Sequence, residues 1–353
     1  MLKSTFNDDD VKILLSAINK KLVLEGNNLD NKNQQSHYCD FIPREYPLSN
    51  EYLSMFDRIL DSTKKQMAIY IGILARKILS EYENPVIVSL LRAGTIIGIL
   101  LKRYIKVIFN EDVQHYSIGM SRGKGIDFCA LNYIKNTNST STIIFVDGWI
   151  GKGTTKNELA KSLKTFNYLY NENVKPIIAV INDIKKCSDF CVTNEDILIP
   201  TSLVNSQGCG LISRITQNDN LIPKNSYNGA IVFDELKNQD KTYQIIYIIS
   251  YYFVKCETDI LNHNYLDNCE DLDVDFLVKK YDIKNVNGLK VGINETIRII
   301  LKKKIDFVVV RDKSDPLLEP ILYLCLSNNF DVLEDTDLKC RAIGVIRNSK
   351  GDE

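Results

Sequence analysis

The chain has 353 residues and carries 44 lysines and arginines against 45 aspartates and glutamates, a formal net charge of −1. This balance excludes a protein that coats nucleic acid by bulk positive charge, and a hydrophobic content of 44% excludes a disordered chain. The longest apolar run, over 243–254, is too short to cross a bilayer, and the first residues turn acidic before any apolar stretch, unlike a secretory signal. We therefore expect a folded cytoplasmic protein without a membrane partner. The chain has nine cysteines, an odd number in a protein too large to need disulfide bonds, which agrees with a reducing compartment.

The first two thirds of the chain alternate predicted strands with predicted helices. Apolar residues at helical spacing predict helices over 50–82, 95–104 and 156–170. Short apolar runs predict strands over 85–91, 113–118, 142–146, 176–181 and 196–199. This alternation favours an α/β fold with a parallel, doubly wound sheet, whose ligands bind beyond the carboxyl ends of the strands. The loops after these strands are therefore the expected places for a functional site.

The distribution of charge predicts where the chain divides. Residues 256–275 hold seven acidic side chains and neither lysine nor arginine. An acidic segment between two apolar-patterned blocks is typical of a linker. We therefore expect a first domain over 1–255, an acidic linker over 256–275 and a second domain over 276–353.

The loop after the strand at 142–146 has the composition of an anion site. Asp147 and Gly148 end the strand, and Gly151-Lys152-Gly153-Thr154-Thr155 leads into the next helix. Glycines let backbone N–H groups approach an anion closely, and a helix N-terminus favours negative charge. Three interpretations are open: a Walker A loop, which here lacks the first glycine and the hydroxyl residue after the lysine; a glycine-rich turn with an incidental aspartate; and a phosphoribosyl-diphosphate (PRPP) loop.

Two further loops carry basic side chains. Arg92, in the run Arg92-Ala93-Gly94-Thr95 between a buried strand and a helix, has a planar guanidinium that suits phosphate oxygens. Arg122 and Lys124 lie among glycines in the loop over 115–127, which is the composition of a basic loop that folds over a substrate. The alternatives are an arginine that binds carbonyls at a strand end and an ordinary surface hairpin.

Five separated strings resemble, in order, the phosphoribosyltransferase-like proteins of bacterial tellurite-resistance and stress gene clusters, which are also labelled StiP-like cysteine proteases. The strings begin at His37, Ser89, His115, Phe145 and Asp196. The resemblance covers about residues 5–235, and it implies a type I phosphoribosyltransferase-like parallel sheet with a PRPP-type pocket. In the PRPP loop of that family, Asp147, Gly153, Thr154 and Thr155 match, while Gly148 replaces the usual second acid.

The resemblance implies PRPP- and Mg²⁺-dependent glycosyl transfer to or from a base or nucleoside-like acceptor. Asp147 would hold the ribose and the Mg²⁺ ion, and Arg92, Arg122 and Lys124 would offset the departing diphosphate. The residues expected to bind the substrate lie in the two glycine-containing loops: Ala93, Gly94, Thr95, Gly148, Gly151, Lys152, Gly153, Thr154 and Thr155. A non-catalytic nucleotide sensor is the alternative, because Gly148 removes one carboxylate.

The cysteine-protease label has less support from the sequence. A nucleophilic cysteine needs a positioned histidine. No local motif pairs Cys129 or Cys209 with His37, His115 or His263, and His115 begins a strand pattern that suggests a buried, structural role. The polar loop over 199–210 either closes one side of the pocket or serves only to pack. From the sequence we therefore set the protease interpretation aside.

The last block predicts a small α/β/α sandwich, with a buried strand over 307–310 and a helix from Pro316 to about 327. The run over 292–298 resembles the helix start of the Pelota-like and ribosomal kink-turn RNA-binding family. The resemblance implies an RNA partner: Gly292 and the helix N-terminus would approach phosphate, Asn294 and Glu295 would read base edges, and Arg298 would meet the backbone. A helix capped by Asn294 is the alternative, and a homodimer is a further expectation.

Overall fold

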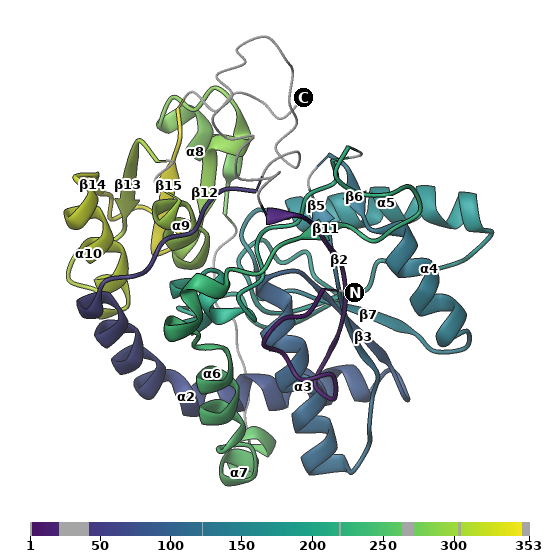
Figure 1. Cartoon of the computed structure of the whole chain (residues 1–353). Helices are drawn as coiled ribbons and strands as arrows, with labels where there is room; N and C mark the ends of the chain where they lie inside the picture. The colour runs from purple at the N-terminus through teal and green to yellow at the C-terminus, as the bar shows by residue number, and fades with distance from the viewer. Residues whose placement is uncertain are drawn as a thin grey trace.

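The computed structural model describes residues 2–20, 42–121, 123–218, 220–262, 272–302 and 305–347 (Figure 1). Within them, the main sheet has the strand order β1 (Lys12–Leu14), β4 (His115–Ile118), β3 (Val86–Leu90), β7 (Ile143–Val146), β9 (Ile178–Asp183) and β10 (Phe190–Thr193). These neighbours all pair in parallel, and the short β8 (Trp149–Ile150) also pairs with β9. The predicted α/β class with a parallel sheet is confirmed.

Helices cover both faces of this sheet, which explains why its strands are continuous apolar runs. One core layer packs α2 (Asn50–Leu79), α3 (Ala93–Phe109) and α6 (Thr242–Ser250) against the sheet. The opposite layer packs α4 (Phe128–Thr137) and α5 (Thr154–Tyr170). Two small pairings lie outside the main sheet: β2 (Ser16–Ala17) with β11 (Gly229–Ala230), and the hairpin of β5 (Met120–Ser121) and β6 (Gly125–Ile126).

One strand prediction is wrong for a specific reason. Residues 196–199 do not form a strand, and the edge strand of the sheet is β10, over Phe190–Thr193. The backbone N–H of Ile199 donates to the side chain of Asn294, and the carbonyl of Ile197 accepts from the same amide. The backbone groups of this segment therefore form hydrogen bonds with the side chain of Asn294, in the tail, instead of with a neighbouring strand.

The tail of the chain folds as the expected small sandwich. Its mixed sheet has the order β12 (Leu289–Val291), β15 (Ala342–Val345), β13 (Phe307–Val310) and β14 (Asp331–Glu334). On one face lie α9 (Ile293–Leu301) and α10 (Glu319–Asn328), and on the other lies α8 (Val274–Lys280). Figure 1 shows this tail lying beside the main sheet, with α9 on the side that faces it.

Part of the predicted linker is helical and packs on the first part of the chain. In α7 (Glu257–Leu261), Glu257 accepts a hydrogen bond from Tyr104 at 2.8 Å and pairs with Arg76. Residues 263–271 lie outside the described residues, so the domain boundaries stay a prediction. No helix in the described ranges is both long and apolar enough to span a membrane.

Two glycines at the end of the sheet give a matched test of the packing. A Cβ atom on Gly94 would lie 2.0 Å from the carbonyl oxygen of Val146, which belongs to the backbone of β7, whereas one on Gly148 would lie 3.4 Å from Ala93. We predict that Gly94→Ala lowers the free energy of unfolding by about 1–3 kcal/mol because a strand must shift. Gly148→Ala, the control, should change it by less than about 1 kcal/mol, and urea unfolding followed by circular dichroism measures both. Equal losses in the two variants would contradict the described packing.

Candidate functional site

The carboxyl edge of the sheet brings together the loops that follow β3 and β7. Gly94 packs against the carbonyl of Val146, and Gly148 lies next to Ala93. Parallel strands deliver their following loops to one edge, so this convergence follows from the topology. The structure therefore juxtaposes the first halves of the two glycine-containing loops.

Arg92 is an ion-paired residue at this edge and not an open anion ligand. It is 8% exposed, and its guanidinium donates to the carboxylate of Glu45 at 2.6 Å and to the carbonyl of Ile212 at 3.1 Å. Glu45 also accepts from the backbone N–H of Ser206 at 2.8 Å. Burial works to raise the pKa of Glu45, but the charge of Arg92 and the hydrogen bonds of Ser206 hold that pKa below its ordinary value.

Cys209 lies directly beside this pair. Its thiol is 4% exposed and donates to the carbonyl of Arg92, the N-cap of α3, at 3.4 Å. Burial raises the pKa of the thiol to about 11, while Arg92, a hydrogen bond of Thr95 and the charge of Arg298 act in the opposite direction.

The other described cysteines have less favourable surroundings. Burial raises the pKa of the thiols of Cys129, Cys187, Cys256, Cys325 and Cys340, and in all of these except Cys325 the strongest charged neighbour is a carboxylate that raises it further. Among the described thiols whose pKa shift is resolved, Cys209 is the only one whose strongest charged neighbour is positive. A cation and a helix N-terminus beside a thiol are the surroundings that activate cysteines.

Asp147 adds an acid–base group to the same edge. It is half-buried directly after β7. Burial raises its pKa to about 7, the N–H of Gly148 and the charge of Arg298 act to lower it, and Glu295 acts to raise it. A carboxyl group that titrates near neutrality is typical of functional sites.

The expected Mg²⁺ ion at Asp147 stays a prediction. Asp147 would offer it one carboxylate, because Gly148 stands in the place of the second acid. In the part of the chain that the structure describes, no group of three or more histidine, cysteine, aspartate or glutamate side chains could hold a metal.

The start of α9, in the tail, reaches this edge. The carboxylate of Glu295 accepts from the indole N–H of Trp149 at 2.9 Å, and the guanidinium of Arg298 lies 5.5 Å from the centre of the Trp149 ring. Asn294 is 2% exposed and binds the backbone of Ile197 and Ile199. The residues expected to read RNA are therefore engaged with the first part of the chain in this arrangement.

Asp196 is the anchor of this contact, and sequence reasoning missed it. One of its carboxylate oxygens accepts from the N–H of Ile293 at 2.9 Å, and the other from the N–H of Arg341 at 2.8 Å. Arg341 also donates through Nε to the carbonyl of Asp196 at 2.8 Å. The sequence offers no signal for this role, since the partners are backbone groups more than 90 residues away along the chain.

The second half of the 147–155 loop faces the tail instead of the loop of Arg92. A Cβ on Gly151 would lie 2.6 Å from the carbonyl oxygen of Val291, and Gly153, with φ +85°, caps α5. Lys152 donates to the carbonyl oxygens of Leu289, at 2.8 Å, and Val286. The expected single anion cradle is therefore split between two places.

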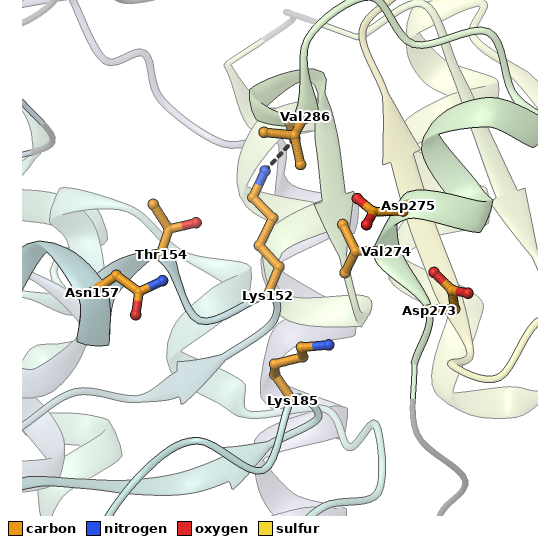
Figure 2. Close-up of a pocket in the computed structure, with 8 residues that line it drawn as sticks. All are labelled: Lys152, Thr154, Asn157, Lys185, Asp273, Val274, Asp275 and Val286. Atoms are coloured by element: carbon orange, nitrogen blue, oxygen red, sulfur yellow. Dashed lines mark hydrogen bonds between the residues drawn. The ribbon is translucent and has the colours of Figure 1, made fainter.

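A pocket of about 430 Å³ lies next to this half-loop, between α5 and the start of α8 (Figure 2). Its lining combines basic, acidic and neutral side chains: Lys152, Thr154, Asn157, Lys185, Asp273, Val274, Asp275 and Val286. Figure 2 shows Lys152 and Lys185 on the side of the main sheet and the two aspartates on the tail. Opposed charges of this kind do not fit a polyphosphate.

Lys124, the described member of the expected basic loop, contacts another part of the chain than Arg92 and Asp147. Lys124 is exposed in the β5–β6 hairpin and donates to the carbonyl of Gln217 at 3.3 Å, and Arg122 lies outside the described residues. Thr155 is the second residue of α5. The 199–210 loop forms the short 3₁₀ turns Pro200–Leu203 and Ser206–Gly208, in which most side chains are buried.

His115 is structural, as the sequence suggested. It is 2% exposed, with Nε2 at 2.8 Å from the hydroxyl of Ser89 and Nδ1 at 2.8 Å from the carbonyl of Asp10. Burial lowers its pKa to about 3, so the ring is neutral. His37 and His263 lie outside the described residues.

The comparisons with known proteins identify the family. A family model described as "Tellurite-like stress resistance cysteine protease StiP" matches residues 4–250, and a model of the PELOTA RNA binding domain matches residues 271–348. A curated protein of Acinetobacter baylyi (strain ATCC 33305 / BD413 / ADP1), "Cysteine protease StiP", is 30% identical over 298 residues, which are 80% of this chain and 76% of that protein. The chain thus belongs to the StiP family of cysteine proteases and ends in a PELOTA RNA-binding domain.

A solved hypoxanthine-guanine-xanthine phosphoribosyltransferase also matches, with 20% identity over 38% of this chain and 79% of its own, and with a TM-score of 0.26. A structural similarity with so low a TM-score says nothing about the activity of this chain. The prediction of a PRPP- and Mg²⁺-dependent transferase, with its nucleotide-sensing alternative, is wrong: the family model and the curated relative are cysteine proteases. The geometry gives the physical reason, because Arg92 is paired with Glu45 and Lys152 with carbonyls of the tail.

The raised pKa of Asp147 predicts a dependence of stability on pH. The folded protein holds this proton up to about pH 7, whereas the ordinary value is 3.8. Between these values the folded state binds more protons than the unfolded chain, so wild-type stability falls as the pH rises. We predict that Asp147→Asn gains on the order of 2 kcal/mol relative to wild type between about pH 5 and pH 8, measured by urea unfolding. A constant difference across that range would show that Asp147 titrates normally.

Proposed function

We propose that this chain is a cytoplasmic stress-response cysteine protease and that Cys209 is its nucleophile. The observation that carries the assignment is the position of the thiol beside Arg92 and the start of α3, at the edge where the sheet presents its loops. The family supplies the reaction class, and these surroundings favour Cys209 over the other described cysteines. The free cysteines of the described residues agree with a reducing compartment.

The chemistry follows the usual course of thiol acyl transfer. The thiol gives its proton to a base, sulfur attacks the peptide carbonyl, and the C–O π pair moves onto oxygen. The pair then returns, the C–N bond breaks, and the amine leaves with the proton. Water hydrolyses the thioester and regenerates the thiol. Backbone N–H groups at the start of α3 favour the negative charge that develops on the oxygen.

We assign the proton exchange to Asp147, because its backbone packs against Gly94 in the loop that carries Arg92, at the edge where Cys209 lies. Its pKa of about 7 allows it to accept and return a proton near neutral pH. His115 is unsuitable because its two ring nitrogens contact Ser89 and Asp10 inside the core. The Cys209 thiol is buried and protonated in this arrangement. In the active form, the residues that bury the thiol therefore have to move aside so that a substrate can reach it.

The first test of this proposal is the loss of the thiol. We predict that Cys209→Ala and Cys209→Ser lower the cleavage of casein by about a thousandfold or more, because no other group forms the acyl intermediate. Cys129→Ala, at a partly exposed thiol next to Asp127, is the matched control and should keep wild-type activity.

Replacement of the remaining cysteines and of the three histidines, one at a time, completes this series. Full activity of Cys209→Ala would refute the assignment, and loss in Cys39→Ala instead would move the nucleophile to that residue. An Asp147→Asn variant with an unchanged pH profile of cleavage would remove Asp147 from the proton transfer.

A second function follows from the PELOTA model. We propose that the tail binds RNA through Gly292, Asn294, Glu295 and Arg298, with the helix N-terminus near phosphate. Asn294 is bound to Ile197 and Ile199 when the tail is docked, so RNA contact through this edge requires α9 to leave the first part of the chain. Docking and RNA binding then oppose each other thermodynamically.

The competition between docking of the tail and RNA binding can be tested at Asp196, which lies in the first part of the chain and is not one of the residues proposed to bind RNA. We predict that Asp196→Asn, which replaces one of the two oxygens that accept from the Ile293 and Arg341 N–H groups by an NH2 donor, tightens binding of a fluorescein-labelled kink-turn RNA hairpin by about fivefold or more. Asp183→Asn is the control, because that buried carboxylate accepts from Cys187 and Ser188 within its own loop. Fluorescence anisotropy measures both affinities. Unchanged or weaker binding in Asp196→Asn would rule out competition at this edge.

A further inference from the structure

Helix α9 is fixed to both loops that carry the proposed catalytic groups. Its residue Asn294 holds the segment that runs on through two 3₁₀ turns to Cys209, by hydrogen bonds of 2.9 Å to the N–H of Ile199 and 2.8 Å to the carbonyl of Ile197. Asp196, in the same segment, caps the helix start at the N–H of Ile293. The position of the Cys209 loop therefore depends on the tail.

The same helix holds the loop of Asp147. Trp149, two residues beyond Asp147, donates to Glu295 at 2.9 Å, and its ring lies 5.5 Å from the guanidinium of Arg298. Glu295 and Arg298 are one helical turn apart, a spacing at which opposite charges attract. Burial acts to raise the pKa of Glu295, but Arg298 and nearby lysines keep that pKa below its ordinary value. The carboxylate therefore stays ionised and can hold the indole.

Arg298 acts electrostatically on both proposed reacting groups. Its charge lowers the pKa of the Cys209 thiol and of the Asp147 carboxyl. Other charged groups also shift these pKa values. Arg92 lowers and Glu45 raises the pKa of Cys209, and Glu295 raises the pKa of Asp147. Of these groups, Glu295 and Arg298 come from the tail, and the rest come from the first part of the chain.

We propose that Glu295 and Arg298 of the tail are positioning residues of the Cys209 site, which is complete only when α9 is docked. This inference rests on the proposed function, since it concerns the same thiol. Glu295 fixes the Trp149 side of the Asp147 loop. Arg298 lies over the ring of Trp149, and its positive charge favours the thiolate of Cys209. The tail is then a structural component of the catalytic site as well as an RNA-binding domain.

The test measures the reactivity of the thiol in the full chain. Wild type, Arg298→Gln and Arg298→Lys are alkylated with iodoacetamide across a range of pH, and the Cys209 peptide is quantified by mass spectrometry. Loss of the charge should move the alkylation profile to higher pH by about one unit, so that the thiol reacts about tenfold more slowly below its pKa. Arg298→Lys should restore most of the wild-type profile. Arg347→Gln is the matched control, because Arg347 is exposed and stacks on Phe307 within the tail.

A second variant, Trp149→Phe, tests the proposal independently in case Arg298→Gln does not fold. Trp149→Phe replaces the indole by a smaller aromatic ring without the N–H that donates to Glu295, and it should move the profile in the same direction by a smaller amount. Circular dichroism confirms that each variant is folded. Faster alkylation at every pH without a shift of the profile would mean that Arg298 only covers the thiol, and an unchanged profile in both variants would overturn the proposal.

The same variants distinguish this inference from the proposed function. If Cys209→Ala keeps full proteolysis, the nucleophile assignment fails, while the alkylation profiles still report whether Arg298 acts on Cys209. If Cys209→Ala is inactive but the profiles of the Arg298 variants match wild type, the protease assignment stands and the tail has no positioning role. A fall in kcat with unchanged KM in Arg298→Gln would support positioning over substrate binding.

Discussion

The contact between Asp196 and the start of α9 determines how the two parts of this protein fit together. A helix start leaves backbone N–H groups without partners, and the carboxylate of Asp196 accepts from the one on Ile293. Its second oxygen accepts from the N–H groups of Arg341, the residue before β15, and of Ala342, the first residue of that strand. One buried side chain thus joins a helix and a strand of the tail to the loop that precedes Cys209. Asp196 is 6% exposed, and this burial raises its pKa to about 6.

The edge of the sheet is a place where charges are held in pairs. Arg92 is ion-paired with Glu45, so its buried guanidinium is not an isolated cation. The half-buried Arg298 acts electrostatically on Glu295, one helical turn away, and lowers the pKa of that carboxyl. These contacts within the protein explain why loops with the composition of an anion site do not bind a phosphate here. The arginine, the lysine and the glycines are all present, but their partners are a carboxylate and carbonyl groups of the protein itself. The family relationship agrees with this geometry, because it assigns the chain to the cysteine proteases, whereas the predicted activity was that of a transferase.

The fold was largely predictable because its signals are local. The apolar run at 85–91 becomes the fully buried strand β3, and the helical spacing after Asn50 becomes α2. The exception, 196–199, is informative. Its composition suits a strand, but its backbone binds Asn294, which no periodicity reveals. The candidate site was predicted less well for the same reason. Arg92 and Asp147 were placed at the correct edge, whereas Cys209 was set aside because the sequence gives no neighbour that could activate it.

The amino-acid sequence by itself determined the parallel sheet, the small sandwich at the tail and the edge at which functional groups gather, because burial patterns and the alternation of strands with helices depend on residues close together along the chain. Only the tertiary structure decided which of those groups face each other. Glu45, Cys209 and Arg298 meet at one edge although long stretches of chain separate them. Whether an arginine binds a ligand or a carboxylate of its own protein depends on such distant contacts, and these follow from packing rather than from any motif.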